Sequence, residues 1–206
     1  MPDHTNDQSP ITNHQLPMAN HQSPITIGVL ALQGDFAEHG KILSDLSVCS
    51  LEVRNRSDLS QCDALILPGG ESTVIMKLLQ ESGLDRAIAD RAREGMPLFG
   101  TCAGAILLSD THLKLMDISV ERNAYGAQAA SFTAQLDIEE IGSVEAAFIR
   151  APRIVRVGNA CTVLAKYNGD PVAVRQGSML ASTFHTELSS EVRLHQYFVD
   201  FVSRGK

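Results

Sequence analysis

Cys102 has the sequence setting of a catalytic thiol. It lies in Gly100-Thr101-Cys102-Ala103-Gly104, after an apolar run that predicts a buried strand and before a segment that predicts a helix. Small neighbours leave room for a nucleophile in such a turn, and a helix N-terminus favours the attacking thiolate. The alternative is a buried structural cysteine, the usual state of a free thiol. We assign that state to the other three cysteines, Cys49, Cys62 and Cys161.

A thiol nucleophile needs a base and a group that orients the base. Phe184-His185-Thr186-Glu187 offers both directly after a predicted strand. Side chains at positions i and i+2 of an extended chain point the same way, so Glu187 can hold the imidazole while His185 faces the thiol. The pattern alone also suits a surface His–Glu pair, but together with Cys102 it predicts a Cys-His-Glu triad. The other candidates lack a comparable carboxylate at a strand end: His39, His112 and His195.

A third strand-end turn is Pro68-Gly69-Gly70-Glu71-Ser72-Thr73. It lacks the Gly-Lys-Ser/Thr of a phosphate-binding loop, which argues against a nucleotide site. Glycine backbone at the carboxyl edge of a parallel sheet can instead donate N–H groups to a substrate, although a simple tight turn is equally compatible with the residues. Gly70 and Ala103 are therefore our candidates for the oxyanion site.

The elements that must position these residues alternate between strands and helices. This order predicts an α/β fold with a mostly parallel sheet, right-handed crossovers and helices on its flanks. The predicted strands are 25–32, 51–53, 64–67 and one opening at 97–99, and the predicted helical segments are 36–46, 72–79, 84–94 and 105–108.

The region from Asp117 to Phe184 differs, because it consists of short β-rich pieces separated by turns. We expect these pieces to be antiparallel strands added beside the parallel ones. They are 131–136, 146–149, 162–166, 172–174 and 179–183. A closing amphipathic helix is predicted from Glu191 to Val202, so residues 25–206 form one domain.

Residues 1–24 are predicted to be a disordered tail. They contain four of the eight prolines and no lysine or arginine, and they show no apolar periodicity. A secretory signal would need a basic start and an apolar centre, so this tail does not fit one. Without such a signal, the four cysteines indicate reduced thiols and a cytoplasmic location.

The charge balance excludes some classes of partner. Seventeen Lys and Arg against 24 Asp and Glu give 206 residues a net charge of −7. A net acidic chain has no overall field that draws it to phosphate backbones or anionic lipids, so we expect no nucleic acid and no membrane partner.

Six motifs resemble the glutaminase subunits of pyridoxal 5′-phosphate synthases, within the class I glutamine amidotransferases. The resemblance extends from Ile25 to the end of the chain. The motifs that contain Cys102 and His185 are shared by the whole class. Three others are more particular to this subunit: Leu67–Thr73, Arg122–Gly126 and Phe148–Pro152. The motifs are Gly100–Gly104, Phe184–Leu188, Leu67–Thr73, Leu30–Asp35, Arg122–Gly126 and Phe148–Pro152.

The resemblance implies that L-glutamine is hydrolysed to L-glutamate and ammonia. Cys102 would attack the side-chain amide, His185 would protonate the leaving ammonia and then activate water, and Glu187 would orient His185. Family contacts to glutamine carry over to Gly70, Glu71, Ser72, Arg122, Ile149 and Arg150. The two arginines suit a substrate that carries a carboxylate.

The resemblance also implies a partner. Ammonia would pass to a barrel-shaped synthase subunit that makes pyridoxal 5′-phosphate from ribose 5-phosphate and glyceraldehyde 3-phosphate, and that partner would switch the glutaminase on. Pyridoxal phosphate is then a product, so we expect neither a cofactor nor a metal in this chain. Ala127 and Thr186 depart from the family, which commonly has Arg and Pro there. The missing arginine at position 127 could alter a contact with the partner subunit, and threonine in place of proline at position 186 makes the backbone beside His185 less rigid. Neither change removes a triad residue.

The sequence leaves three further functions open. The chain could be the glutaminase subunit of another amidotransferase, such as imidazole glycerol phosphate synthase, or a stand-alone cysteine hydrolase on the same scaffold. It could also be a non-catalytic assembly subunit, although the presence of all three triad residues argues against lost turnover.

Overall fold

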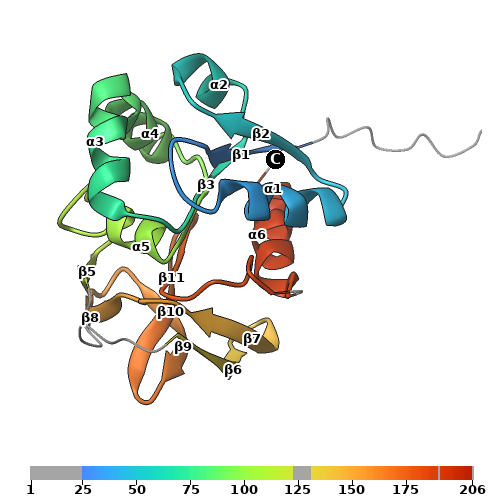
Figure 1. The fold of residues 1–206 in the computed structure, drawn as a ribbon, viewed down its shortest axis with the longest axis vertical. Helices are drawn as coiled ribbons and strands as arrows, with labels where there is room; N and C mark the ends of the chain where they lie inside the picture. The colour runs from blue at the N-terminus through green and yellow to red at the C-terminus, as the bar shows by residue number, and fades with distance from the viewer. Residues whose placement is uncertain (1–24, 123–130, 190, 206) are drawn as a thin grey trace, which may run out of the picture.

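A computed structural model describes residues 25–122, 131–189 and 191–205 (Figure 1). The predicted tail, 1–24, lies outside these residues, as do Asn123 to Gly126 of the fifth motif and Ala127. In the described part of the chain, no helix is both long and apolar enough to cross a membrane.

The centre of the fold is a seven-stranded sheet in the order β2-β1-β3-β4-β11-β10-β9. The first five strands are mutually parallel, and β10 and β9 continue the sheet in antiparallel pairing. The predicted α/β class, with a mostly parallel sheet and added antiparallel strands, is confirmed. The strands are β1 (Thr26–Leu30), β2 (Cys49–Val53), β3 (Ala64–Leu67), β4 (Leu98–Thr101), β9 (Thr162–Tyr167), β10 (Asp170–Gln176) and β11 (Met179–Ser182).

The orientation predicted for one strand of this sheet is wrong. We expected 179–183 as an added antiparallel strand, but β11 lies parallel to β4, with Leu180 opposite Phe99. The strands between residues 118 and 176 pair in antiparallel fashion. After them the chain comes back to the middle of the central sheet, where β11 lies between β4 and β10. Strand pairing over this distance depends on tertiary packing, which local residue types do not encode.

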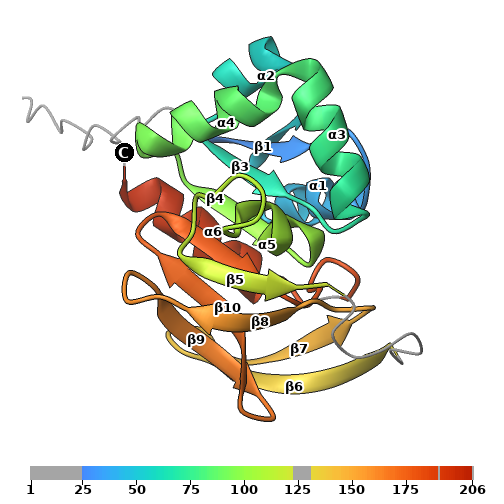
Figure 2. The ribbon, with the colours of Figure 1, turned by 90° about the vertical axis from the view of Figure 1, so that its left-hand side faces the viewer.

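Two further two-stranded sheets lie beside β9 and β10, in the lower part of the molecule as drawn in Figure 2. One pairs β6 (Phe132–Ile138) with β7 (Gly142–Phe148), and the other pairs β5 (Ile118–Glu121) with β8 (Arg153–Val157). The sequence analysis placed β6 and part of β7 but missed β5 and β8. Both missed strands are short and contain charged residues, so their apolar signal is weak.

Helices cover both faces of the central sheet (Figure 1). Because side chains alternate along a strand, Leu65 and Leu67 pack with the helices of one face, and Ile66 packs with those of the other. The first face carries α3 (Ser72–Ser82), α4 (Leu84–Arg93) and α5 (Ala103–Leu108), and the second carries α1 (Phe36–Asp45) and α6 (Arg193–Arg204). A short helix, α2 (Arg56–Ser60), was not predicted; Asn55 begins it with a capping box.

Candidate active site

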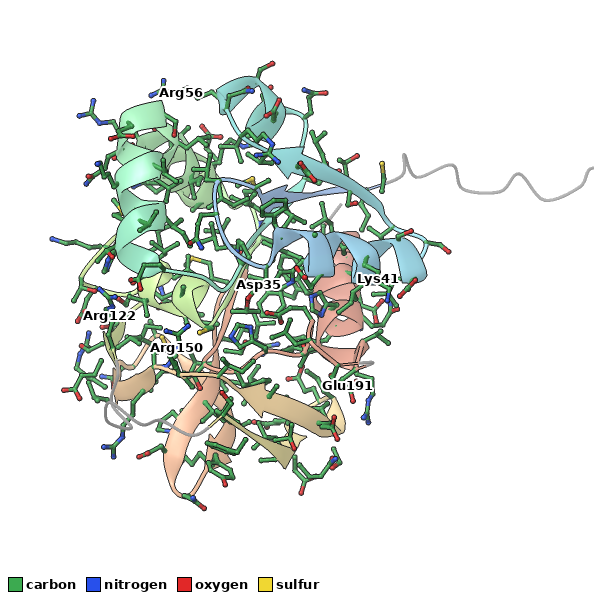
Figure 3. All side chains as sticks on the ribbon, in the orientation of Figure 1. Asp35, Lys41, Arg56, Arg122, Arg150 and Glu191 are labelled. Carbon is green, nitrogen blue, oxygen red and sulfur yellow. The ribbon has the colours of Figure 1, made fainter. Side chains whose placement is uncertain are left out.

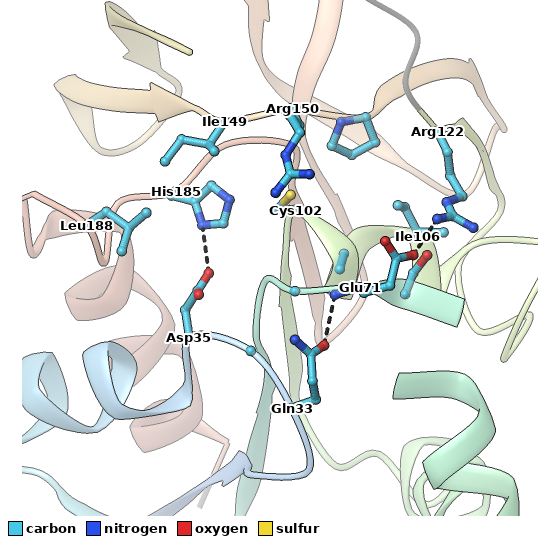
Figure 4. Close-up of a pocket in the computed structure, with 15 residues that line it drawn as sticks. Gln33, Asp35, Glu71, Cys102, Ile106, Arg122, Ile149, Arg150, His185 and Leu188 are labelled. Carbon is cyan, nitrogen blue, oxygen red and sulfur yellow. Dashed lines mark hydrogen bonds and ion pairs between the residues drawn. The ribbon is translucent and has the colours of Figure 1, made fainter. Parts of the chain in front are cut away.

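The predicted site residues come together at the carboxyl edge of the parallel sheet. Cys102 follows β4, His185 follows β11 and Gly70 follows β3, and parallel strands bring these ends to one edge. A pocket of about 450 Å³ opens there (Figure 4). Every predicted site residue except Glu187 lines it: Gly70, Glu71, Ser72, Cys102, Ala103, Arg122, Ile149, Arg150 and His185.

Cys102 occupies a strained turn between β4 and α5. Its φ is 47° and its ψ −102°, a backbone conformation that residues with a side chain rarely adopt. Its N–H donates to the carbonyl of Ser182 at 2.8 Å, which ties the turn to β11. A Cβ on Gly104 would lie 2.0 Å from the carbonyl oxygen of Leu67, so the turn excludes a side chain there, as the sequence predicted.

The imidazole of His185 lies between Cys102 and Glu187. Its Nδ1 is 2.5 Å from Glu187 Oε1, which leaves Nε2 for the thiol. Burial lowers the pKa of His185, but hydrogen bonds to Cys102 and Glu187 outweigh burial and raise the pKa to about 10. The protonated imidazole is therefore the favoured form beside these two partners.

Glu187 is buried behind His185 and does not line the pocket. Its Oε2 accepts a hydrogen bond from the N–H of Thr186 at 3.0 Å. Burial opposes the charged form, but the imidazoles of His39 and His185 and the hydrogen bond from His185 hold the pKa of Glu187 below its usual range. Glu187 is thus a carboxylate that can only accept hydrogen bonds.

Asp35 is a site residue that the sequence analysis did not single out. It is half-buried, it lines the pocket, and its Oδ2 lies 3.5 Å from His185 Nδ1 (Figure 4). Burial raises the pKa of Asp35, although His185 opposes that shift. Gln33-Gly34-Asp35 follows a parallel strand, as the other site turns do, so its position at a strand end was the available signal.

Asp35, His185 and Glu187 also have the residue types that can bind a metal ion. One ligand atom from each lies within 4.8 Å of the other two. Binding a cation there would break the contact between Glu187 and His185. We therefore assign the atoms of His185 and Glu187 to their mutual hydrogen bond rather than to a metal.

The mouth of the pocket is formed by segments from three parts of the fold. Arg122, just after β5, makes an ion pair with Glu71, which precedes α3. Ile149 and Arg150 follow β7, and Arg150 extends toward Cys102 in Figure 4. The two small sheets therefore bring the predicted arginines to the pocket that Cys102 and His185 line, and a pair of backbone hydrogen bonds joins Ala147 of β7 to His185.

Two histidines that the sequence analysis set aside lie under the triad. His39, on α1, places its Nε2 3.6 Å from Glu187 Oε1, and its Nδ1 lies 2.8 Å from His195 Nε2, on α6. Both rings are fully buried. No local sequence pattern reveals this contact, because it joins two helices that are far apart along the chain. His112 lies in another pocket, beside α4.

Several known proteins are similar to this chain in sequence and in fold. A family model of the SNO glutamine amidotransferase family matches residues 29–204. A pyridoxal 5′-phosphate synthase subunit PdxT of Thermotoga neapolitana is 46% identical over 185 residues, which cover 85% of this chain and 98% of that protein. The PdxT of Thermus thermophilus is 49% identical over 183 residues, with coverage of 84% and 96%.

Solved structures agree with the sequence comparisons. A crystal structure of a glutamine amidotransferase superposes with a TM-score of 0.83 at 46% identity and covers 86% of this chain and 98% of its own. The structure of PurLQS from Thermotoga maritima, at 15% identity and a TM-score of 0.68, covers 87% of this chain and 99% of its own, and shares the fold alone. The resemblance drawn from the motifs is confirmed: the chain belongs to the SNO glutamine amidotransferase family.

Proposed function

We propose that this chain is the glutaminase subunit of a pyridoxal 5′-phosphate synthase, with Cys102, His185 and Glu187 as its triad. The observation that carries the proposal is the buried contact between His185 and Glu187 directly behind Cys102 in one pocket. The identity of about half of the residues with proteins named PdxT supports the choice of synthase.

The triad geometry suits hydrolysis of an amide. The thiolate of Cys102 attacks the side-chain carbonyl carbon of L-glutamine, and His185 gives its proton to the nitrogen that leaves as ammonia. His185 then removes a proton from water, which attacks the thioester and releases L-glutamate. Throughout these steps Glu187 holds the ring through Nδ1, so that Nε2 faces the reacting atoms.

Backbone N–H groups near Cys102 suit the oxyanion. Ala103 is the first residue of α5, and N–H groups in the first turn of a helix have no acceptor within it. Gly70 has a φ of 144°, a conformation that glycine adopts without strain, and it lines the same pocket. We assign the N–H groups of Gly70 and Ala103 to the oxyanion site, where they donate to the negative charge that develops on the substrate carbonyl oxygen.

The polar ends of glutamine find partners on the pocket wall. Arg122 and Arg150 are the cations that suit the α-carboxylate, and Glu71 is an anion that suits the α-amino group. The hydroxyl of Ser72 is buried without a hydrogen-bond partner among the described residues. Because an unsatisfied buried hydroxyl is unfavourable, a substrate that bonds to Ser72 gains from the contact.

In this proposal ammonia passes to the barrel-shaped synthase subunit, which assembles pyridoxal 5′-phosphate and activates the glutaminase. The protein works in the cytoplasm, where its thiol stays reduced. All four cysteines are free in the structure. The direct test is glutaminase turnover of this chain with and without that synthase subunit. Strong activity of the chain alone would instead favour a stand-alone hydrolase.

The same assay distinguishes the remaining functions. If the chain served an imidazole glycerol phosphate synthase, only the acceptor subunit of that enzyme would raise turnover. If the chain were a non-catalytic assembly subunit, no partner would raise turnover, although a complex would still form.

Substituting the nucleophile tests the chemistry. In the complex, Cys102→Ala should abolish synthesis of pyridoxal 5′-phosphate from glutamine, because no thioester can form. Synthesis from added ammonium should remain, because the acceptor site is untouched. Both rates are measured by the absorbance of the product. Persistent glutamine-dependent synthesis in this variant would show that Cys102 is not the nucleophile.

A further inference from the structure

A cluster of buried polar side chains lies directly beneath the triad. His39, Thr101, Thr186 and His195 are fully buried, and Glu187 is 5% exposed. Apart from Glu187, none of them belongs to the proposed triad, and none lines the pocket. Polar groups buried to this extent are unfavourable unless they are hydrogen-bonded to one another.

The contacts in this cluster form a chain that ends at Glu187. Thr186 Oγ1 lies 3.5 Å from His195 Nδ1, and His195 Nε2 lies 2.8 Å from His39 Nδ1. The other nitrogen of His39, Nε2, lies 3.1 Å from Thr101 Oγ1 and 3.6 Å from Glu187 Oε1. His39 is therefore the link between the second histidine and the carboxylate.

The carboxylate determines the direction of the hydrogen bonds. Glu187 can only accept, so an N–H at His39 Nε2 is attracted to it, whereas a lone pair there would be repelled. The hydroxyl oxygen of Thr101, 3.1 Å from the same nitrogen, accepts from this N–H. A neutral ring with its hydrogen on Nε2 must accept at Nδ1, so His195 donates from Nε2. His195 then accepts at Nδ1, where the hydroxyl of Thr186 donates. Burial, which lowers the pKa of both rings, agrees with two neutral imidazoles.

We propose that His39 is a positioning residue of the triad: its Nε2–H faces Glu187 and holds that carboxylate against His185, while His195 fixes the tautomer of His39. The inference rests on the proposed glutaminase function. Glu187 Oε1 lies between His185 on the pocket side and His39 on the core side. The contact between His39 Nε2 and Glu187 Oε1, at 3.6 Å, is electrostatic, because the hydrogen bond of this nitrogen is with Thr101 Oγ1 at 3.1 Å.

The tautomers can be measured without any activity. In the full chain labelled with ¹⁵N-histidine at about pH 7.5, above the ordinary histidine pKa, we expect His39 and His195 to be neutral with the hydrogen on Nε2. The measurement is the ¹⁵N shift of each ring nitrogen and its coupling to the ring protons, and His39→Asn and His195→Gln assign the signals. A hydrogen on Nδ1 of His39, or a charged His39 ring, would overturn the proposal.

Two substitutions of His39 separate positioning from packing. The amide of Gln can place a donor near the position of Nε2, whereas the amide of Asn reaches only the position of Nδ1. We expect His39→Gln to keep kcat near the wild-type value in the complex with the synthase subunit. His39→Asn keeps a partner for His195 but should lower kcat about 100-fold, because the carboxylate shifts.

The Michaelis constant and a double-mutant cycle complete the test. Both variants should keep the KM for L-glutamine, because His39 does not touch the pocket. In the Glu187→Gln background, His39→Asn should cause no further loss, since its effect passes through Glu187. Equal losses in the Gln and Asn variants, or additive losses in the cycle, would refute positioning. An inactive wild-type complex would instead refute the proposed function, while the tautomer measurement would still stand.

Discussion

At the scale of single residues, identical side chains take opposite roles according to their neighbours. His185 faces a carboxylate and a thiol, which raise its pKa to about 10 against the effect of burial. Within the residues that the structure describes, His195 has only uncharged groups at its ring (another imidazole, the hydroxyl of Thr186 and the ring of Phe99), and burial is the largest cause that lowers its pKa to about 3. One ring is thus prepared to carry a proton, and the other to stay neutral.

The two arginines of the pocket provide a prediction at this scale. Arg150→Gln should raise the KM for L-glutamine about 10- to 100-fold, because a charge-assisted hydrogen bond contributes about 1.5–3 kcal/mol. The kcat should change little, since we propose that Arg150 binds the α-carboxylate, at the end of the substrate that does not react. Arg56→Gln is the matched control, because Arg56 bonds to the carbonyl of Gly83 at the far end of the molecule (Figure 3). Steady-state kinetics of the complex measure both; an unchanged KM for Arg150→Gln would contradict the assignment.

At the scale of elements, the turn between β4 and α5 depends on two glycines. A Cβ at Gly100 would lie 2.6 Å from the backbone of Gly104, and a Cβ at Gly104 would collide with the carbonyl of Leu67. The helix thereby packs close to β3 and β4, and this contact places Cys102 at the end of the strand. The cysteine elbow is thus a property of helix and strand packing as well as of the cysteine.

Alanine substitution tests this packing. Gly104→Ala should lower the free energy of unfolding by about 3 kcal/mol, since the clash is with backbone that cannot move aside. The control is Gly40→Ala within α1, where a Cβ would meet nothing within 4 Å. That variant should be more stable than the wild type by about 0.5–1 kcal/mol. Urea denaturation measures both variants, and equal effects would contradict the packing argument.

At the scale of the whole molecule, α1 and α6 meet over one face of the sheet, and their histidines share its core. His39 and His195 pack with Phe99 there, and the ring centroids of Phe99 and His195 are 5.5 Å apart. Burying two neutral imidazoles gives each of them a contribution to stability that is lost as pH falls through the histidine range. Because His39 contacts both His195 and Glu187, the packing of α1 against α6 also affects the position of the Glu187 carboxylate.

The pH dependence of stability follows from these shifts. An unfolded histidine has a pKa of about 6.5, so below that pH the unfolded chain binds protons that folded His195 excludes. The contribution of His195 to the free energy of unfolding should therefore decrease as pH falls, by about 2 kcal/mol between about pH 8 and pH 5. His185 acts oppositely, because its stabilisation is complete below about pH 6.5 and is lost as pH rises toward 10. The contributions of His185 and His195 therefore offset each other between about pH 8 and pH 5.

Urea denaturation of the wild type and of His195→Gln over the same pH range isolates this contribution, because His185 titrates alike in both proteins. The difference between their free energies of unfolding should decrease by about 2 kcal/mol from about pH 8 to pH 5, because the variant no longer excludes a proton at this position. A difference that does not change with pH would show that His195 does not titrate on unfolding. Glu187 does not confuse the result, since its lowered pKa removes stability only below its unfolded value of about 4.5.

Much of the site could be predicted from residues that are neighbours along the chain. The elbow around Cys102, the His185–Glu187 pair and the turn at Gly70 are local patterns, and the alternation of strands and helices implied a parallel sheet whose carboxyl ends meet. These features follow from backbone geometry and side-chain spacing within a few residues, so a single sequence contains them.

Tertiary structure alone decided the rest. It placed β11 beside β4, formed the small sheets that bring Arg122 and Arg150 to the pocket, and set Asp35 against His185. It also placed His39 under Glu187, although the two are on different elements far apart in sequence. Such contacts arise from the burial of two sheet faces at once, and the free energy of that packing depends on every element together rather than on any local pattern.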